Sequence, residues 1–207
     1  EAKDISLMVG ATTGEMDCYE YSMEEPIRTN TADEVLDMLY AMNEGLGNPV
    51  GQITPYGHDE IHERYLASGD DKLKRALTIF GAYATQLGTM YYAEAQAKWN
   101  KTYHYSWNWM PDATRLSRSG QQVKFSRWDR ALHCAELPVL FNSGDVAYPA
   151  LSAWWLFFIG DDLTDSVEKD IVPEDLVKKT VMTWYTFAKT GDPNNALIPK
   201  WDPYDQE

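Results

Sequence analysis

Strand patterns are scarce in this sequence, and that scarcity limits what the chain can fold into. Residues 5–10 form a short apolar run stopped by a glycine, which is typical of a buried strand. Residues 102–109 alternate large aromatic with smaller polar side chains, the period of a half-buried strand. Two or three strands do not make a stable sheet that is covered on both faces. The chain is therefore either mostly helical or part of a sheet that residues elsewhere complete, and we favour the second.

Helical patterns occupy much of the remaining chain. Thr31 followed by Glu34 is a capping box, which predicts the start of a helix. Apolar residues recur at three- and four-residue steps from 70 to 99, where two glycines indicate a kink or two helices end to end. A third helix is predicted over 173–189, where a proline opens the pattern and a glycine follows it. Residues 112–130 are polar and rich in Ser and Arg, which predicts a long loop.

The charge of the chain argues against two classes of partner. Its 32 acidic and 18 basic residues give a formal charge of −14, and no cluster of Lys or Arg offsets it. Such a surface repels phosphate backbones and anionic lipids, so we expect neither nucleic-acid nor membrane-surface binding. The apolar run at 153–159 is far shorter than the roughly 18 to 20 residues that span a bilayer.

The aromatic and cysteine contents carry two further expectations. Eight Trp and 13 Tyr are a heavy aromatic load, and such surfaces need burial in the core or against another polypeptide, so self-association is expected. The two cysteines, Cys18 and Cys134, provide neither a disulfide framework nor a zinc site. They favour a reducing compartment, and we expect a cytoplasmic location.

Two residues are candidates for acid–base chemistry. Glu15 follows a predicted strand and a Gly-rich turn, where a carboxylate can orient an imidazole, although a solvated loop glutamate is the alternative. His133 precedes an apolar segment and is a candidate general base, with a structural histidine as the alternative. His58 and His62 have a helical zinc spacing but no third ligand, so no metal site is predicted. His104 is expected to pack between its neighbours in the aromatic strand.

Four segments resemble the type-B carboxylesterase family, the group of α/β-hydrolases that includes cholinesterases and para-nitrobenzyl esterases. LMVGATTGE (7–15) is similar to the family's strand and turn that end in the triad glutamate. HCAELPVLF (133–141) is similar to its triad histidine segment. WYTFAKTGDPN (184–194) matches its late helix and is the most specific of the four, and WDPY (201–204) resembles its tail.

The resemblance implies an α/β fold, the C-terminal half of an α/β-hydrolase that is mostly helical with the last two or three sheet strands. Residues 1–207 would be the C-terminal portion of one carboxylesterase domain. Glu15 would be the triad acid and His133 the base, in the chain order that this superfamily uses after the nucleophile. No cofactor is implied. The partners would be the N-terminal half of the same enzyme and a small-molecule ester.

The chain also departs from the family pattern. It contains no Gly-x-Ser-x-Gly motif, so the nucleophile is expected upstream of Glu1, and these residues alone are expected to be inactive as an esterase. Gly14 stands where many relatives have Asp, and Cys134 stands where Gly is common. Two alternatives remain open: a catalytically inactive esterase-like protein used for binding or adhesion, and an independent helical interaction domain.

Overall fold

The computed structural model describes residues 3–45, 71–111, 114–116, 122–124, 128–142 and 172–205. Strand β1 (Leu7–Thr12) pairs in parallel with β2 (Thr102–Trp107), with Leu7 opposite Thr102 and Thr12 opposite Trp107. The structure therefore confirms both predicted strands and makes them neighbours, although residues 13–101 lie between them in the sequence. Parallel neighbours need a long crossover connection, and the connection between these two strands contains several helices.

Gly10 does not stop β1, contrary to the sequence prediction. The strand continues through it to Thr12 because Gly10 lies opposite Tyr105 in the register. A Cβ at position 10 would lie 2.2 Å from the Tyr105 carbonyl oxygen and 2.4 Å from its ring. The glycine therefore marks a close approach between the two strands instead of a strand end.

The helices after β1 form the main hydrophobic core. A 3₁₀ turn (Asp17–Tyr19) leads into α1 (Glu20–Thr29), which the sequence did not predict, and then into α2 (Ala32–Gly45). The predicted capping box is present, since Glu34 N–H donates to Thr31 Oγ1 at 3.3 Å and Thr31 N–H donates to Glu34 Oε2 at 2.7 Å. The fully buried core side chains come from α1, α2 and the next helix, and include Ile27, Val35, Leu39, Leu77 and Phe80.

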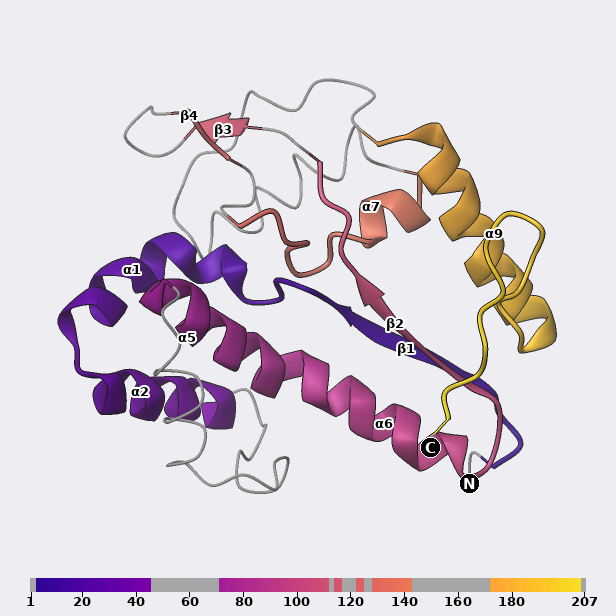
Figure 1. The fold of residues 1–207 in the computed structure, drawn as a ribbon, viewed down its shortest axis with the longest axis horizontal. Helices are drawn as coiled ribbons and strands as arrows, with labels where there is room; N and C mark the ends of the chain where they lie inside the picture. Colours follow the sequence, from indigo (N-terminus) through magenta and orange to yellow (C-terminus); the bar gives the residue numbers. More distant parts are fainter. Residues whose placement is uncertain are drawn as a thin grey trace.

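The long helical stretch predicted over 70–99 is one nearly continuous rod (Figure 1). It consists of α5 (Lys72–Gly81), a π-helical turn (Ala82–Gln86) and α6 (Leu87–Ala97). Asp71 caps its first turn by accepting from Leu73 N–H at 3.0 Å. The predicted interruption at Gly81 is thus a change of helix type, and Gly88 lies inside α6. The wider turn lets Gln86 Nε2 donate to the Thr12 carbonyl at 3.0 Å, which ties the rod to the end of β1.

Residues 112–130 are not simply a long loop, as predicted. Within them, β3 (Thr114–Leu116) and β4 (Gln122–Lys124) form an antiparallel pair. Strands of three residues are too short for alternating polarity to be recognised in a sequence. After Arg130 the chain reaches a single-turn helix, α7 (Leu137–Leu140).

Helix α9 (Glu174–Thr190) lies on the opposite side of the sheet from α6, as Figure 1 shows, and extends the predicted helix by one residue at its end. Tyr103 packs edge-on against Phe187 and Tyr105 against Trp184, with ring centroids 6.2 and 5.2 Å apart. Gly191 follows the helix with φ of +74° and donates to the Phe187 carbonyl at 2.7 Å. It is the left-handed helix stop that the sequence predicts.

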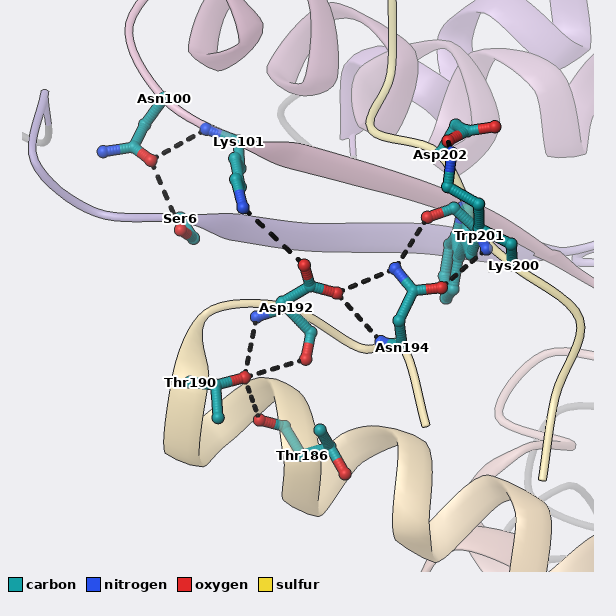
Figure 2. A network of polar contacts seen from close by, with 10 residues as sticks. All are labelled: Ser6, Asn100, Lys101, Thr186, Thr190, Asp192, Asn194, Lys200, Trp201 and Asp202. Carbon is teal, nitrogen blue, oxygen red and sulfur yellow. Dashed lines mark hydrogen bonds and ion pairs between the residues drawn. The ribbon is translucent and has the colours of Figure 1, made fainter. Parts of the chain in front are cut away.

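The Gly-Asp-Pro-Asn sequence after α9 forms a C-terminal clasp, which we define as Asp192, Asn194 and Trp201 (Figure 2). Asp192 Oδ1 accepts from the backbone and side-chain amides of Asn194 at 3.0 and 2.7 Å. The Asn194 side chain then pairs with the Trp201 backbone in both directions, at 2.8 and 2.7 Å. Tyr204 N–H donates to the Thr102 carbonyl at 2.7 Å, so the tail lies against the outer edge of β2.

The other edge of the sheet is open in the described part of the chain. Leu7 and Thr13 N–H donate to carbonyls of the β2 segment, so alternate residues of β1 face β2. Met8 and Gly10 therefore direct their backbone groups to the opposite edge, where no described strand pairs with them. Thr12 also faces outward, and its two groups are satisfied by Glu15 and Gln86.

Some predicted features cannot be compared with the structure. His58, His62 and the apolar run 153–159 lie outside the described residues. Among the residues that are described, no helix is both long and apolar enough to cross a membrane.

Candidate active site

Glu15 and His133, which are 118 residues apart in the sequence, meet beyond the carboxyl end of the sheet. Glu15 Oε2 lies 2.5 Å from His133 Nδ1. The loops that carry them are joined next to this contact, because Gly14 N–H donates to the Ala131 carbonyl at 2.8 Å and Gly14 forms a parallel bridge with Leu132. The structure therefore places both predicted residues in one site.

The Glu15 carboxylate is fixed on both of its oxygens. Oε1 accepts from Thr12 N–H at 2.6 Å, while Oε2 faces His133. Only 4% of the residue is exposed, so the carboxylate is withdrawn from water. The solvated-loop interpretation of Glu15 is therefore wrong. A buried, doubly held carboxylate next to an imidazole fixes the orientation of that ring.

His133 is more open to solvent than its partner. About 40% of its side chain is exposed. The contact with Cys134 and the hydrogen bond to Glu15 raise the pKa of His133 above its ordinary value, against the opposing effect of burial. When Nδ1–H donates to Glu15, Nε2 is the nitrogen that can accept a proton, which is the arrangement of a general base.

Cys134 has a left-handed backbone, with φ of +64°. Non-glycine residues adopt this conformation at a cost, which gives a physical reason for glycine being common after the histidine in the family that the chain resembles. Cys134 adopts the backbone conformation that glycine would adopt without strain. Its thiol lies beside the His133 imidazole.

Two acidic residues near the dyad were not assigned roles from the sequence. Burial raises the pKa of Glu136, which lies within electrostatic range of both Glu15 and His133. Its Oε2 is buried and has no hydrogen-bond partner among the described residues. Asp17, only 1% exposed, forms a bidentate ion pair with Arg130 at 2.8 and 2.5 Å. The sequence signal that could have found them is their charge and their position, since Asp17 follows Glu15 by two residues and Glu136 follows His133 by three.

Two other candidate residues, His104 and Cys18, do not belong to the dyad. His104 borders a pocket of about 300 Å³ between the sheet and α6. Its Nε2 lies 3.1 Å from Thr89 Oγ1 and its ring packs against Tyr204, so its packing partners come from α6 and the tail and not from the aromatic strand itself. Burial lowers the pKa of His104. Burial raises the pKa of the Cys18 thiol, which disfavours the nucleophilic thiolate. Both cysteines are free. Within the described ranges, no group of His, Cys, Asp and Glu could hold a metal ion.

Solved structures define the class of fold. A carboxylesterase of Geobacillus stearothermophilus is 19% identical, with a TM-score of 0.60 over 99% of this chain and 35% of that chain. Two structures of PNB esterase, at 16% and 19% identity, have TM-scores of 0.54 and 0.53 over 97% of this chain and 32% of theirs. The fold is that of the α/β-hydrolase esterases, and the chain spans about a third of the length of these structures.

The sequence matches the carboxylesterase family over residues 1–207. The chain therefore belongs to the carboxylesterase family. A comparison with functionally curated proteins finds no match.

Proposed function

We propose that this chain supplies the acid, Glu15, and the base, His133, of a Ser-His-Glu carboxylesterase. The observation that carries the proposal is the 2.5 Å contact between Glu15 Oε2 and His133 Nδ1. Burial of the acid, exposure of the base and membership of the carboxylesterase family support it. The nucleophilic serine would belong to a part of the protein outside residues 1–207.

In the proposed reaction, the serine hydroxyl attacks the carbonyl carbon of an ester. His133 Nε2 takes the hydroxyl proton and then gives it to the departing alkoxide, so that an alcohol leaves and an acyl-enzyme remains. His133 next takes a proton from water, which attacks the acyl carbonyl. The bond to the serine oxygen then breaks, His133 returns the proton to that oxygen, and the carboxylic acid is released. Glu15 stays ionised throughout and stabilises the imidazolium ion that forms in each step.

We propose that residues 1–207 are the C-terminal portion of a single domain, and that the N-terminal half of the same enzyme joins it at the β1 edge. The outward-facing backbone groups of Met8 and Gly10 fit a further parallel strand at this edge. The opposite edge of the sheet is covered by the tail at Tyr204. Without its partner strand, an open edge of this kind favours self-association. The two free thiols fit a reducing compartment such as the cytoplasm.

Hydrolysis of para-nitrophenyl acetate tests the proposal. The assay compares this chain alone, the chain mixed with the upstream half, and the mixture carrying Glu15→Gln or His133→Gln. We expect activity only in the mixture, and a loss on the order of 10³-fold or more for His133→Gln. His104→Gln is the matched control, since it removes another half-buried histidine outside the dyad.

A mixture that folds to the expected mass and hydrolyses no ester would contradict the esterase proposal. It would favour the alternative of an inactive esterase-like binding or adhesion protein. Activity that survives His133→Gln would instead show that another group is the base.

A further inference from the structure

Asp17 and Arg130 connect the loop that carries Glu15 with the loop that carries His133. Arg130 Nε and Nη2 donate to the two carboxylate oxygens of Asp17 at 2.8 and 2.5 Å. Arg130 Nη1 also donates to Thr78 Oγ1 at 2.8 Å, which anchors the pair on α5. The side chains of Asp17 and Arg130 are 1% and 17% exposed, so this two-point contact is largely removed from water. We call these two residues the acid–base clamp.

Gly14 makes room for the clamp. A Cβ at position 14 would lie 2.6 Å from Asp17 Oδ2 and 2.9 Å from Arg130 Cβ, both closer than real Cβ contacts. The φ of Gly14 does not require glycine, so the space is the reason for it. A side chain at position 14 is therefore incompatible with the Asp17–Arg130 contact as it stands. The Asp17 carboxylate can occupy its place only because position 14 has no side chain.

We propose that Asp17 and Arg130 are positioning residues that hold the Glu15 carboxylate in hydrogen-bond register with the His133 imidazole. The inference rests on the proposed function of the Glu15–His133 pair. Asp17 lies two residues after the acid and Arg130 three residues before the base, so movement of either clamp residue changes the separation of the two loops. The backbone bridge at Gly14 sets the distance between the loops, and the bidentate contact fixes their relative twist, because two parallel hydrogen bonds resist rotation.

The energetics of the pair favour positioning over net stabilisation. Burial raises the pKa of Asp17, and the Arg130 guanidinium opposes this effect. A buried ion pair loses hydration that its own attraction barely replaces, and apolar side chains of similar volume are often equally stable. The Asp17–Arg130 pair therefore matters to the site through its geometry, which orients the two loops. Its contribution to the free energy of unfolding is secondary.

An NMR titration of the 207-residue chain tests the clamp without requiring activity. The first variant, Asp17→Leu/Arg130→Met, replaces both partners with apolar side chains and leaves no buried charge unpaired. The second, Arg130→Lys, keeps the charge but loses the two-pronged contact. The readouts are the proton affinity of His133, assigned by means of His133→Gln, and the low-field resonance of the Nδ1 proton shared with Glu15. Circular dichroism checks that each variant is folded.

We expect the proton affinity of His133 to fall about tenfold in the double variant, as the partner carboxylate loses its alignment. The low-field resonance should broaden or disappear, with a smaller effect in Arg130→Lys. Glu25→Gln, which breaks the exposed Glu25–Arg28 pair, is the control and should change neither readout. A folded double variant with an unchanged resonance and unchanged titration would overturn the clamp. If the double variant does not fold, an unchanged titration in Arg130→Lys overturns it.

A different result would count against the Glu15–His133 pair itself. If His133 of the unsubstituted chain titrates at its ordinary value, and Glu15→Gln does not alter it, the proposed function fails at its first step. The two failures are therefore separable, because the clamp is judged only by the change between the unsubstituted chain and its variants.

Discussion

A side chain at position 14 would begin 2.6 Å from Asp17 Oδ2, and this crowding gives a mutational prediction. Gly14→Asp should lower the free energy of unfolding by about 1–3 kcal/mol, the usual cost of overpacking. Combining it with Asp17→Ala should cost less than the sum of the single changes, because the second substitution vacates the space. Urea unfolding of the three variants measures this coupling. Additive costs would show that the two positions do not compete.

Cys134 provides a second prediction, from its φ of +64°. Cys134→Gly relieves the left-handed strain but adds freedom to the unfolded chain, so the free energy of unfolding should change by less than about 1 kcal/mol. Cys134→Val adds a β-branched side chain to the same conformation and should be more destabilising, by about 1–2 kcal/mol. Thermal unfolding of both variants checks the order, and equal stabilities would contradict the strain argument.

The raised pKa of His133 makes part of the stability depend on pH. The folded-state pKa exceeds that of the unfolded chain, so the stabilisation is complete below the unfolded value and is lost as pH rises through the folded value. The difference in free energy of unfolding between the unsubstituted chain and His133→Gln should therefore be largest below pH about 6.5 and decrease above it. Urea titrations on either side of that pH measure the difference. A difference that grows with pH would contradict the raised pKa.

Glu15 and His133 could be named as candidates from the sequence, because a turn after a strand and a histidine before an apolar segment are local patterns. Their roles as acid and base were predicted from the resemblance of residues 7–15 and 133–141 to the carboxylesterase family. The clamp could not be predicted in the same way. Asp17 and Arg130 are 113 residues apart, and one aspartate among 32 acidic residues carries no mark of burial. Nor does the sequence show that Asp17 and Arg130 fill the space beside Gly14.

At the scale of elements, the clasp makes a prediction about β2. Asn194→Ala removes the side chain that joins Asp192 to the Trp201 backbone, and should lower the free energy of unfolding by about 1–3 kcal/mol. The Tyr204 amide should exchange with solvent faster, because its bond to Thr102 depends on the position of the tail. Hydrogen exchange measures the second effect. Lys200→Ala, which breaks an exposed ion pair with Asp202, is the control.

Helices were predicted more completely than strands and loops. The capping box at Thr31, the repeated apolar steps of α5 and α6, and the Gly191 stop are local signals that a sequence displays. Helix α1 was missed because Pro26 lies inside it and argues against a helix when only propensity is considered. The end of β1 was misplaced because Gly10 is needed for the close approach of Tyr105 and does not end the strand. That approach depends on the pairing of distant segments, which the local sequence does not show.

At the scale of the whole molecule, the β1 edge distinguishes the chain alone from the proposed complete enzyme. Met8 and Gly10 amides should exchange rapidly in the 207-residue chain and become protected when the upstream half is present, because a further strand would accept their hydrogen bonds. Val9, which faces β2, should be protected in both states and serves as the internal reference. Protection of Met8 and Gly10 in the isolated chain as a monomer would contradict an open edge.

The position of the clasp also has a consequence for synthesis. Asn194 and Trp201 are translated after β2 and α9, so the growing polypeptide exposes the outer edge of β2 until the last part of this segment has left the ribosome. A bare strand edge is a template for pairing with another chain. A premature stop codon after position 195 would therefore remove Trp201 and Tyr204 and leave a product whose bare β2 edge is prone to aggregation. Such a truncation would be harmful through protein quality control even though Glu15 and His133 are both retained.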